Sequence, residues 1–84
     1  MSVAENSPII PVARVLDVSG LSCPLPLLKA KLALAEMPSG EVLHVLATDP
    51  LAPLDFQAFC LRTGHEMVRL VETEARSEFF IRKA

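Results

Sequence analysis

The stretch from Pro24 to Met37 places the tightest limit on what this chain can fold into. Its residues favour helix, none of them is β-branched, and the turn sequence Pro38-Ser39-Gly40 stops the helix. Proline is favoured in a first helical turn, where its missing N–H would have no partner. We therefore predict a helix over 24–37, with Cys23 as its N-cap residue and Pro24 and Pro26 in its first turn.

The remaining pattern predicts short strands and a second helix. Branched apolar runs bounded by turn residues indicate strands, and Gly64 is a natural C-terminal stop for a helix. The predicted strands are 13–18, 41–47, 65–73 and 77–84, and the second helix is 48–64. This βαβαββ order favours an α+β fold, a two-layer α/β sandwich with a four-stranded mixed sheet and two helices on one face.

The other face of such a sheet has nothing to cover it in so short a chain. We therefore expect charged side chains at the solvent-facing positions of the last two strands. The candidates are Arg69, Glu78, Arg82 and Lys83. Residues 1–12 are predicted to form a flexible N-terminal tail, and residues 13–84 a single domain.

Composition and charge exclude several classes of protein. The chain has 84 residues, of which 51% are hydrophobic and 21% charged, a balance typical of a globular domain and not of a disordered segment. A net charge of −2 with scattered basic residues argues against direct nucleic-acid binding. No run is long enough for a membrane span, and the first twelve residues lack the features of a signal peptide. We expect a cytoplasmic protein with no membrane insertion.

Cys23 is the strongest candidate for a reactive residue. Ser, Thr, Asp or Asn would cap a helix better, so helix stability does not explain a cysteine there. The free N–H groups of Leu25 and Leu27 and the positive end of the helix dipole would favour an anion at the sulfur. On this basis we expect the pKa of the Cys23 thiol to be lowered. A thiolate there could attack a sulfur or a carbonyl carbon, bind a soft metal, or form a persulfide.

The other residues that could assist catalysis have plainer interpretations. His44 lies in the middle of a strand and His65 follows a helix end, so neither is placed as a general base. Cys60 stands between apolar residues as a small inert side chain, and neither cysteine has the spacing of a metal site. The position of Asp49 near the start of the second helix favours a role as its capping residue over a contact with a partner protein.

The first helix has two apolar stripes where one would be enough for a core. Leu27, Ala30, Leu34 and Met37 form the predicted core stripe. The second stripe consists of Leu25, Leu28 and Leu32. It is a protein-docking surface, or it lies under the N-terminal tail, or its leucines are simply tolerated at the surface. Lys31 beside it could add charge near the cysteine, pair with an acid such as Glu36, or simply be solvated.

The sequence Cys23-Pro24-Leu25-Pro26 is similar to the CPxP motif of the TusA/SirA-like sulfur carriers. The resemblance covers about residues 15–72 and includes Thr48-Asp49-Pro50 and Asp55-Phe56. It implies that Cys23 accepts sulfane sulfur as a persulfide and relays it to a partner protein. It also implies that Pro24 and Pro26 shape the helix start, and that Lys31 occupies a basic position.

The resemblance further implies a sulfurtransferase-type carrier more than a stand-alone catalyst, without a cofactor other than the covalent sulfur. Its partners would be a sulfur donor, a cysteine desulfurase or rhodanese-like protein, and a sulfur-acceptor protein. Pathways from tRNA thiolation and molybdenum-cofactor supply to sulfur oxidation, selenium use and regulation stay open.

Two other functions stay open from the sequence. One is a non-catalytic regulatory or interaction module that docks through the first helix. The other is a thiol redox protein, which would require Cys60 close to Cys23 as its resolving partner.

Overall fold

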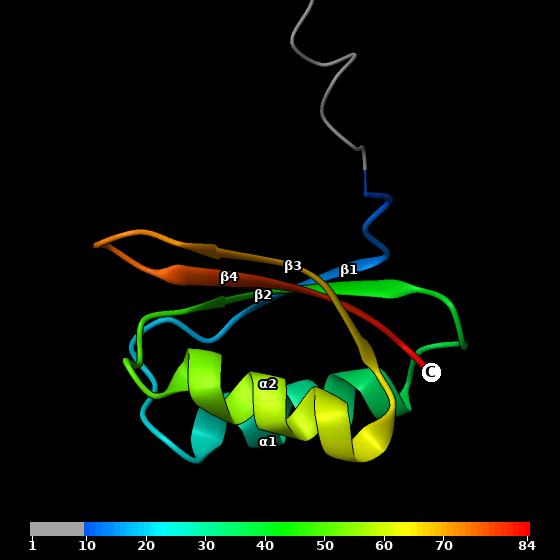
Figure 1. The fold of residues 1–84 in the computed structure, drawn as a ribbon, viewed down its shortest axis with the longest axis horizontal. Coiled ribbons are helices and arrows are strands. Elements are labelled where there is room, and N and C mark those ends of the chain that lie inside the picture. Colours follow the sequence, from blue (N-terminus) through cyan, green and yellow to red (C-terminus); the bar gives the residue numbers. More distant parts are fainter. Residues whose placement is uncertain (1–9) are drawn as a thin grey trace, which may run out of the picture.

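The computed structural model describes residues 10–84, and the predicted βαβαββ order is confirmed (Figure 1). Each predicted element is present, with ends that differ from the prediction by a few residues. The elements are β1 (Arg14–Asp17), α1 (Leu25–Ala35), β2 (Val42–Ala47), α2 (Ala52–Thr63), β3 (Glu66–Glu72) and β4 (Ser77–Arg82). Most of the predicted tail, residues 1–12, lies outside the described residues, so its flexibility stays a prediction.

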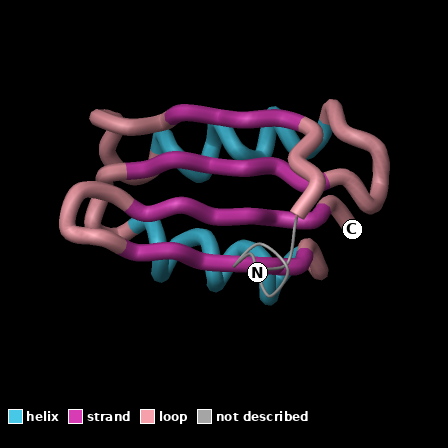
Figure 2. Tube along the Cα trace, turned by 90° about the horizontal axis from the view of Figure 1, so that it is seen from above, coloured by secondary structure: helices cyan, strands magenta, loops and turns pink. Residues whose placement is uncertain are grey.

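The four strands form one mixed sheet in the order β1-β2-β4-β3 (Figure 2). β1 pairs with β2 in parallel, and β4 pairs with both β2 and β3 in antiparallel. A parallel pair requires a crossover, which α1 supplies. Because β1 and β2 point the same way, the loops that follow them emerge at the same end of the sheet. Cys23 lies in the first of these loops.

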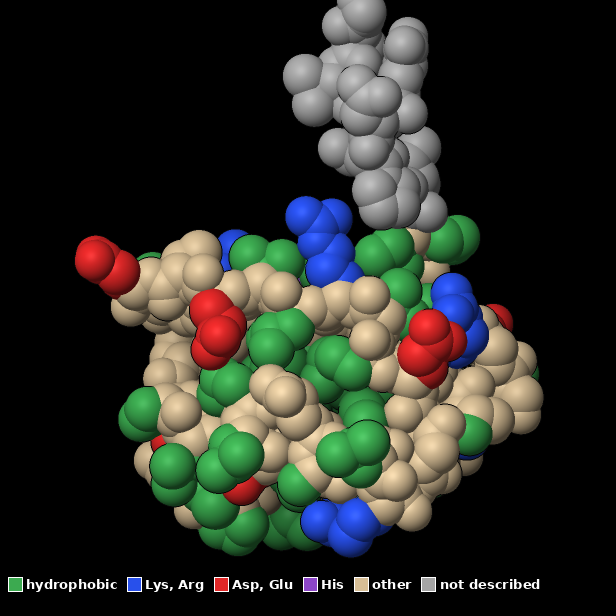
Figure 3. Space-filling model, viewed as in Figure 1, with side chains coloured by type: hydrophobic (Ala, Val, Ile, Leu, Met, Phe, Trp, Pro, Cys, Tyr) green, Lys and Arg blue, Asp and Glu red, His purple; other side chains and the backbone are tan. Residues whose placement is uncertain are grey.

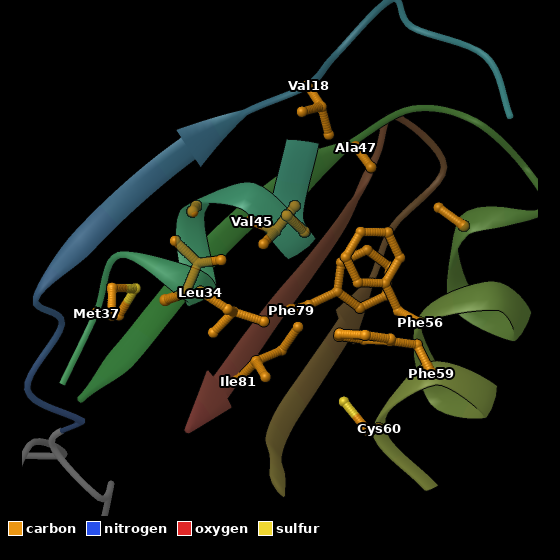
Figure 4. Close-up of a cluster of buried hydrophobic side chains, with 14 residues drawn as sticks. Val18, Leu34, Met37, Val45, Ala47, Phe56, Phe59, Cys60, Phe79 and Ile81 are labelled. Carbon is orange, nitrogen blue, oxygen red and sulfur yellow. The ribbon is translucent and has the colours of Figure 1, made fainter. Parts of the chain in front are cut away.

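Both helices cover the same face of the sheet, and the core lies between the two layers (Figures 1 and 4). At its centre the rings of Phe56 and Phe79 stack with centroids 4.5 Å apart. The predicted core stripe of α1 is confirmed: Ala30, Leu34 and Met37 are buried, and Leu27 packs against them. The buried cluster comprises Val18, Ala30, Ala33, Leu34, Met37, Leu43, Val45, Ala47, Ala52, Phe56, Phe59, Cys60, Phe79 and Ile81.

The uncovered face of the sheet carries paired polar side chains. Glu78 on β4 lies 2.8 Å from His44 on β2, whose ring stacks on Phe80. Arg82 forms an ion pair with Glu66 across the β3–β4 ladder at 2.6 Å. These contacts confirm that the last strands place charge toward solvent. His44 thus has the packed strand role that its position predicted.

Lys83 departs from this pattern, and its predicted solvent-facing position is wrong. Its Nζ donates to the carbonyl oxygens of Leu34 and Met37 at 2.7 and 3.0 Å. These oxygens belong to the last turn of α1 and the residues just after it, where helical carbonyls lack partners within the helix. The side chain therefore ties the end of β4 to the end of α1.

Candidate functional site around Cys23

Cys23 is exposed in the loop between β1 and α1, and the loop between β2 and α2 lies beside it. Two hydrogen bonds join the loops. The backbone N–H of Gly20 donates to Thr48 Oγ1 at 2.8 Å, and the N–H of Cys23 donates to Asp49 Oδ2 at 3.1 Å. Gly20 has a φ of +83°, a conformation that glycine adopts without strain. The cysteine is therefore held at the end of the sheet to which β1 and β2 point.

The helix behind Cys23 begins one residue later than predicted. Pro24 is the N-cap residue and Pro26 lies within the first turn, so both prolines still occupy positions where an N–H is expendable. The N–H of Leu25 donates to the carbonyl of Ser22 at 2.9 Å. One of the two donors expected to face the sulfur is therefore already occupied.

The predicted lowering of the Cys23 thiol pKa is wrong, because neighbouring carboxylates raise this pKa. The hydrogen bond between the Cys23 thiol and the Asp55 side chain raises the thiol pKa above its ordinary value. Desolvation and the negative charges of Asp55 and Asp49 act in the same direction. Asp55 comes from the first turn of α2.

Asp49 does not have its predicted capping role. Leu51 is the N-cap residue of α2 and makes no side-chain cap hydrogen bond. The carboxylate of Asp49 instead accepts the hydrogen bond from the Cys23 backbone, while its own carbonyl accepts from the N–H of Ala52. Asp49 thus joins the start of α2 to the cysteine loop.

Lys31 lies two turns along α1 from the cysteine. Its Nζ sits over the ring of Phe59 on α2, 5.7 Å from the centroid, a cation–π contact between the two helices. Glu36 is not its partner, because Glu36 forms an ion pair with Arg14 at 2.7 Å. The contact gives Lys31 a packing role between the helices.

The predicted second stripe of α1 is exposed, as the sequence suggested. Between 46% and 70% of the surface of Leu25, Leu28 and Leu32 is accessible. Leu51 and Leu54, at the start of α2, were not predicted as part of this surface and are 53% and 70% exposed. Figure 3 shows apolar side chains gathered over this end of the helical layer. We call these five leucines the leucine patch.

The effect of Asp55 on the pKa of the Cys23 thiol was not predicted from the sequence. These residues are far apart in the chain and meet only because α1 and α2 start at the same end of the sheet. The one available signal was the pair Asp55-Phe56 in the family resemblance, which gave the position but no role.

The remaining titratable candidates lie away from Cys23. His44 lies on the uncovered sheet face, and His65 Nδ1 accepts a hydrogen bond from the backbone N–H of Ala84 at 3.0 Å. Cys60 is 6% exposed within the core, as expected of a small apolar residue, and both cysteines are free thiols. Among the described residues, no group of three His, Cys, Asp or Glu side chains could hold a metal ion. In the same part of the chain, no helix is long and apolar enough to cross a membrane.

Comparison with known proteins decides the family. Residues 14–83 match the family described as Sulfurtransferase TusA. The chain belongs to this family. It is 51% identical to the sulfur carrier protein TusA of Allochromatium vinosum over 69 residues, which cover 82% of this chain and 91% of that protein. It is 37% identical to the sulfur carrier protein TusA of Pseudomonas paraeruginosa over 73 residues, with coverages of 87% and 92%.

A solved structure agrees with the fold. The SirA-like protein of Desulfitobacterium hafniense superimposes with a TM-score of 0.73 at 28% identity, covering 82% of this chain and 95% of that one. The protein is a TusA-like sulfur carrier, and such a carrier needs a sulfur donor and a sulfur acceptor.

Proposed function

We propose that Cys23 is the residue that carries the sulfur, as a persulfide. The observation that carries this proposal is the placement of the Cys23 thiol. It is exposed on a loop held by two hydrogen bonds, whereas Cys60 is buried in the core. A carrier must present its cargo to two different proteins in turn, and an exposed sulfur at the end of the fold allows both encounters.

The surface around Cys23 is suited to binding proteins, both the sulfur donor and the sulfur acceptor. The leucine patch supplies exposed apolar surface next to the sulfur, and such patches often mark interaction sites. We propose that partners dock through Leu25, Leu28 and Leu32, with Asp49 at the edge of the contact. Pro24 and Pro26 fix the abrupt helix start behind the cysteine.

By the same proposal, the donor is a cysteine desulfurase or a rhodanese-like protein, and the acceptor is a further protein. Lys31 is a basic residue beside the leucine patch on α1, and its contact with Phe59 links α1 to α2. We place the carrier in the cytoplasm. Both cysteines are free thiols, and the reducing cytoplasm would keep the working thiol available.

The test is sulfur loading followed by mass spectrometry. After incubation with a desulfurase and cysteine, or a rhodanese and thiosulfate, the wild-type protein should gain one sulfur atom that a reductant removes. Cys23→Ser should gain none, and Cys60→Ser is the matched control that should load like the wild type. Loading of Cys23→Ser, or no loading of the folded wild type by any such donor, would refute the proposal.

A second pair of variants tests the docking surface. Leu28→Glu should slow loading from the protein donor but not from a small persulfide, because only the protein donor uses the leucine patch. If Cys23→Ser leaves cellular function intact while Leu28→Glu abolishes it, the protein is instead an interaction module that uses the same helix.

A further inference from the structure

Side-chain oxygens continue the pairing of β1 with β2 beyond the ends of these strands. The N–H of Val18 still donates to a backbone carbonyl of β2, at 2.8 Å. Farther along, the N–H of Gly20 donates to Thr48 Oγ1 at 2.8 Å. The N–H of Cys23 then donates to Asp49 Oδ2 at 3.1 Å. Two adjacent side chains of one loop thus hold the backbone of the other, and we call Thr48 and Asp49 the loop clamp.

Asp49 uses its polar groups inside the fold. Its carboxylate accepts from the cysteine loop, and its carbonyl accepts from the N–H of Ala52 at the start of α2, at 3.0 Å. Hydrogen bonds to an ionised carboxylate are stronger than those between neutral groups. The clamp therefore fixes the Cys23 loop firmly against the loop that leads into α2.

The position of the clamp relates Cys23 to the leucine patch. Cys23 stands two residues before Leu25 on α1, and Asp49 stands two residues before Leu51 at the start of α2. The patch therefore takes leucines from both of the segments that the clamp joins. A protein donor that docks on the patch holds its own sulfur at a fixed place, so the transfer requires Cys23 to be at a fixed place too.

We propose that Thr48 and Asp49 are positioning residues for sulfur transfer between Cys23 and a docked protein. The inference rests on the proposed function, in which Cys23 bears the sulfur and partners dock through the leucine patch. Thr48 and Asp49 act through the backbone of the cysteine loop, because their hydrogen bonds reach Gly20 N–H and Cys23 N–H. Their role is to place the attacking sulfur in line with the bond that breaks.

The transfer itself balances with a donor persulfide, R–S–SH, as the co-reactant. The sulfur of Cys23 forms a bond to the outer sulfur of the donor. The S–S bond of the donor breaks, its electron pair stays on the sulfur attached to R, and the thiol proton of Cys23 passes to that sulfur. The products are Cys23–S–SH and R–SH. The clamp residues are unchanged by the reaction.

The test compares a protein donor with a small one. A cysteine desulfurase with cysteine must dock before it transfers sulfur, whereas glutathione persulfide needs no docking. A variant that only changes the reactivity of the thiol changes uptake from both donors alike. The maximum rate with the desulfurase divided by the rate with glutathione persulfide therefore reports positioning, and we call it the donor ratio.

Two variants of Asp49 separate its hydrogen bond from its charge. Asp49→Ala removes both, and the donor ratio should fall by about 10- to 100-fold, because a misplacement of about 1 Å can cost on the order of 100-fold. Asp49→Asn keeps an oxygen that accepts from the Cys23 N–H and loses only the charge, so it should retain most of the ratio. The carrier concentration that half-saturates the desulfurase should not change in either variant.

Thr48 and a distant acid complete the set. Thr48→Val has nearly the same shape without the hydroxyl and should lower the donor ratio, whereas Thr48→Ser keeps the hydroxyl and should not. Glu41→Ala removes a carboxylate at the opposite end of the sheet and is the control, with an unchanged ratio. All measurements use the full chain, and mass spectrometry follows the gain of sulfur at a series of carrier concentrations.

Backbone hydrogen exchange shows directly whether the clamp is open. The amide of Cys23 should exchange faster in Asp49→Ala than in the wild type or in Asp49→Asn, and the amide of Gly20 should do so in Thr48→Val. Circular dichroism checks that each variant is folded.

The possible results separate positioning from the other roles of Asp49. A donor ratio of Asp49→Ala equal to that of the wild type would overturn the proposal. An equal loss in Asp49→Asn and Asp49→Ala would assign the effect to charge, and a higher half-saturating concentration at an unchanged maximum rate would assign it to contact with the partner; either result would also overturn it. A folded wild type that takes up no sulfur from either donor would instead refute the persulfide function on which the inference rests.

Discussion

Replacing Lys83 by methionine tests whether the last residues of the chain hold α1 in place. In the wild type the ammonium donates to two carbonyls at the end of α1, at 2.7 and 3.0 Å, in a partly buried position. Methionine keeps an apolar stem of similar length but cannot donate. The backbone hydrogen bonds of Lys83 with Gly40 and Glu41 are retained, so the substitution isolates the side chain.

The expected cost of Lys83→Met follows from the two bonds it removes. A hydrogen bond to a charged group contributes about 1.5 to 3 kcal/mol, and a cation at a helix C-terminus adds a few tenths more. One ammonium shared between two carbonyls cannot contribute both in full, so we expect a loss of about 2 kcal/mol. For a domain of this size, that lowers the melting temperature by roughly 8 to 16 °C.

Urea denaturation and calorimetry measure this loss, and Lys29→Met is the control. Lys29 lies exposed on α1, and no hydrogen bond or ion pair of its side chain with another described residue is present. Its substitution should change the free energy of unfolding by less than about 0.5 kcal/mol. Equal stabilities of the two variants would show that the Lys83 side chain does not anchor the helix.

Two further predictions concern the core and the uncovered sheet face. Phe56→Leu removes the ring stacked on Phe79 and should lower the free energy of unfolding in urea by about 1 to 2 kcal/mol; an unchanged value would show that the stack is not stabilising. The hydrogen bond with His44 lowers the pKa of Glu78, so its stabilising effect is present above the carboxyl pKa of the unfolded chain, about 4.3, and is lost as the pH falls through the lower folded value. Glu78→Gln should therefore be about 0.5 to 1 kcal/mol less stable than the wild type at pH 6, and urea titrations should show the difference decreasing as the pH falls below the unfolded carboxyl pKa. A difference that does not change with pH would contradict this assignment.

Local patterns were enough to predict the elements of the fold. The helix between Pro24 and the turn at residues 38–40, the strand at 41–47 and the stop at Gly64 each depend on neighbouring residues, which the sequence displays directly. The buried stripe of α1 also followed, because helical spacing alone separates Leu34 from Leu32. Only the exact ends differ from the prediction, by at most four residues.

The parts that could not be predicted are contacts between segments far apart in the chain. Asp49 looks like a helix-capping acid in the sequence, and only the parallel pairing of β1 with β2 brings it and Asp55 to the neighbourhood of Cys23. That meeting reversed the expected direction of the thiol pKa, because a local argument included the helix end but not the facing carboxylates. The position of Lys83 could not be predicted for the same reason, since its carbonyl partners lie 46 and 49 residues away in the chain.

The topology of the sheet also separates the C-terminus from Cys23. Ala13 donates its backbone N–H to Val42 at the start of β2, and the carbonyl of Ala84 accepts a hydrogen bond from Ser39 at the same end. Cys23 lies beyond the other end of β2, whose six residues span about 20 Å. An affinity tag, a surface linkage or a fused domain at the C-terminus would therefore leave the end of the fold that carries Cys23 facing outward. Tethering the protein in this way should preserve sulfur exchange, and it offers a direct means to measure partner binding on an immobilised carrier.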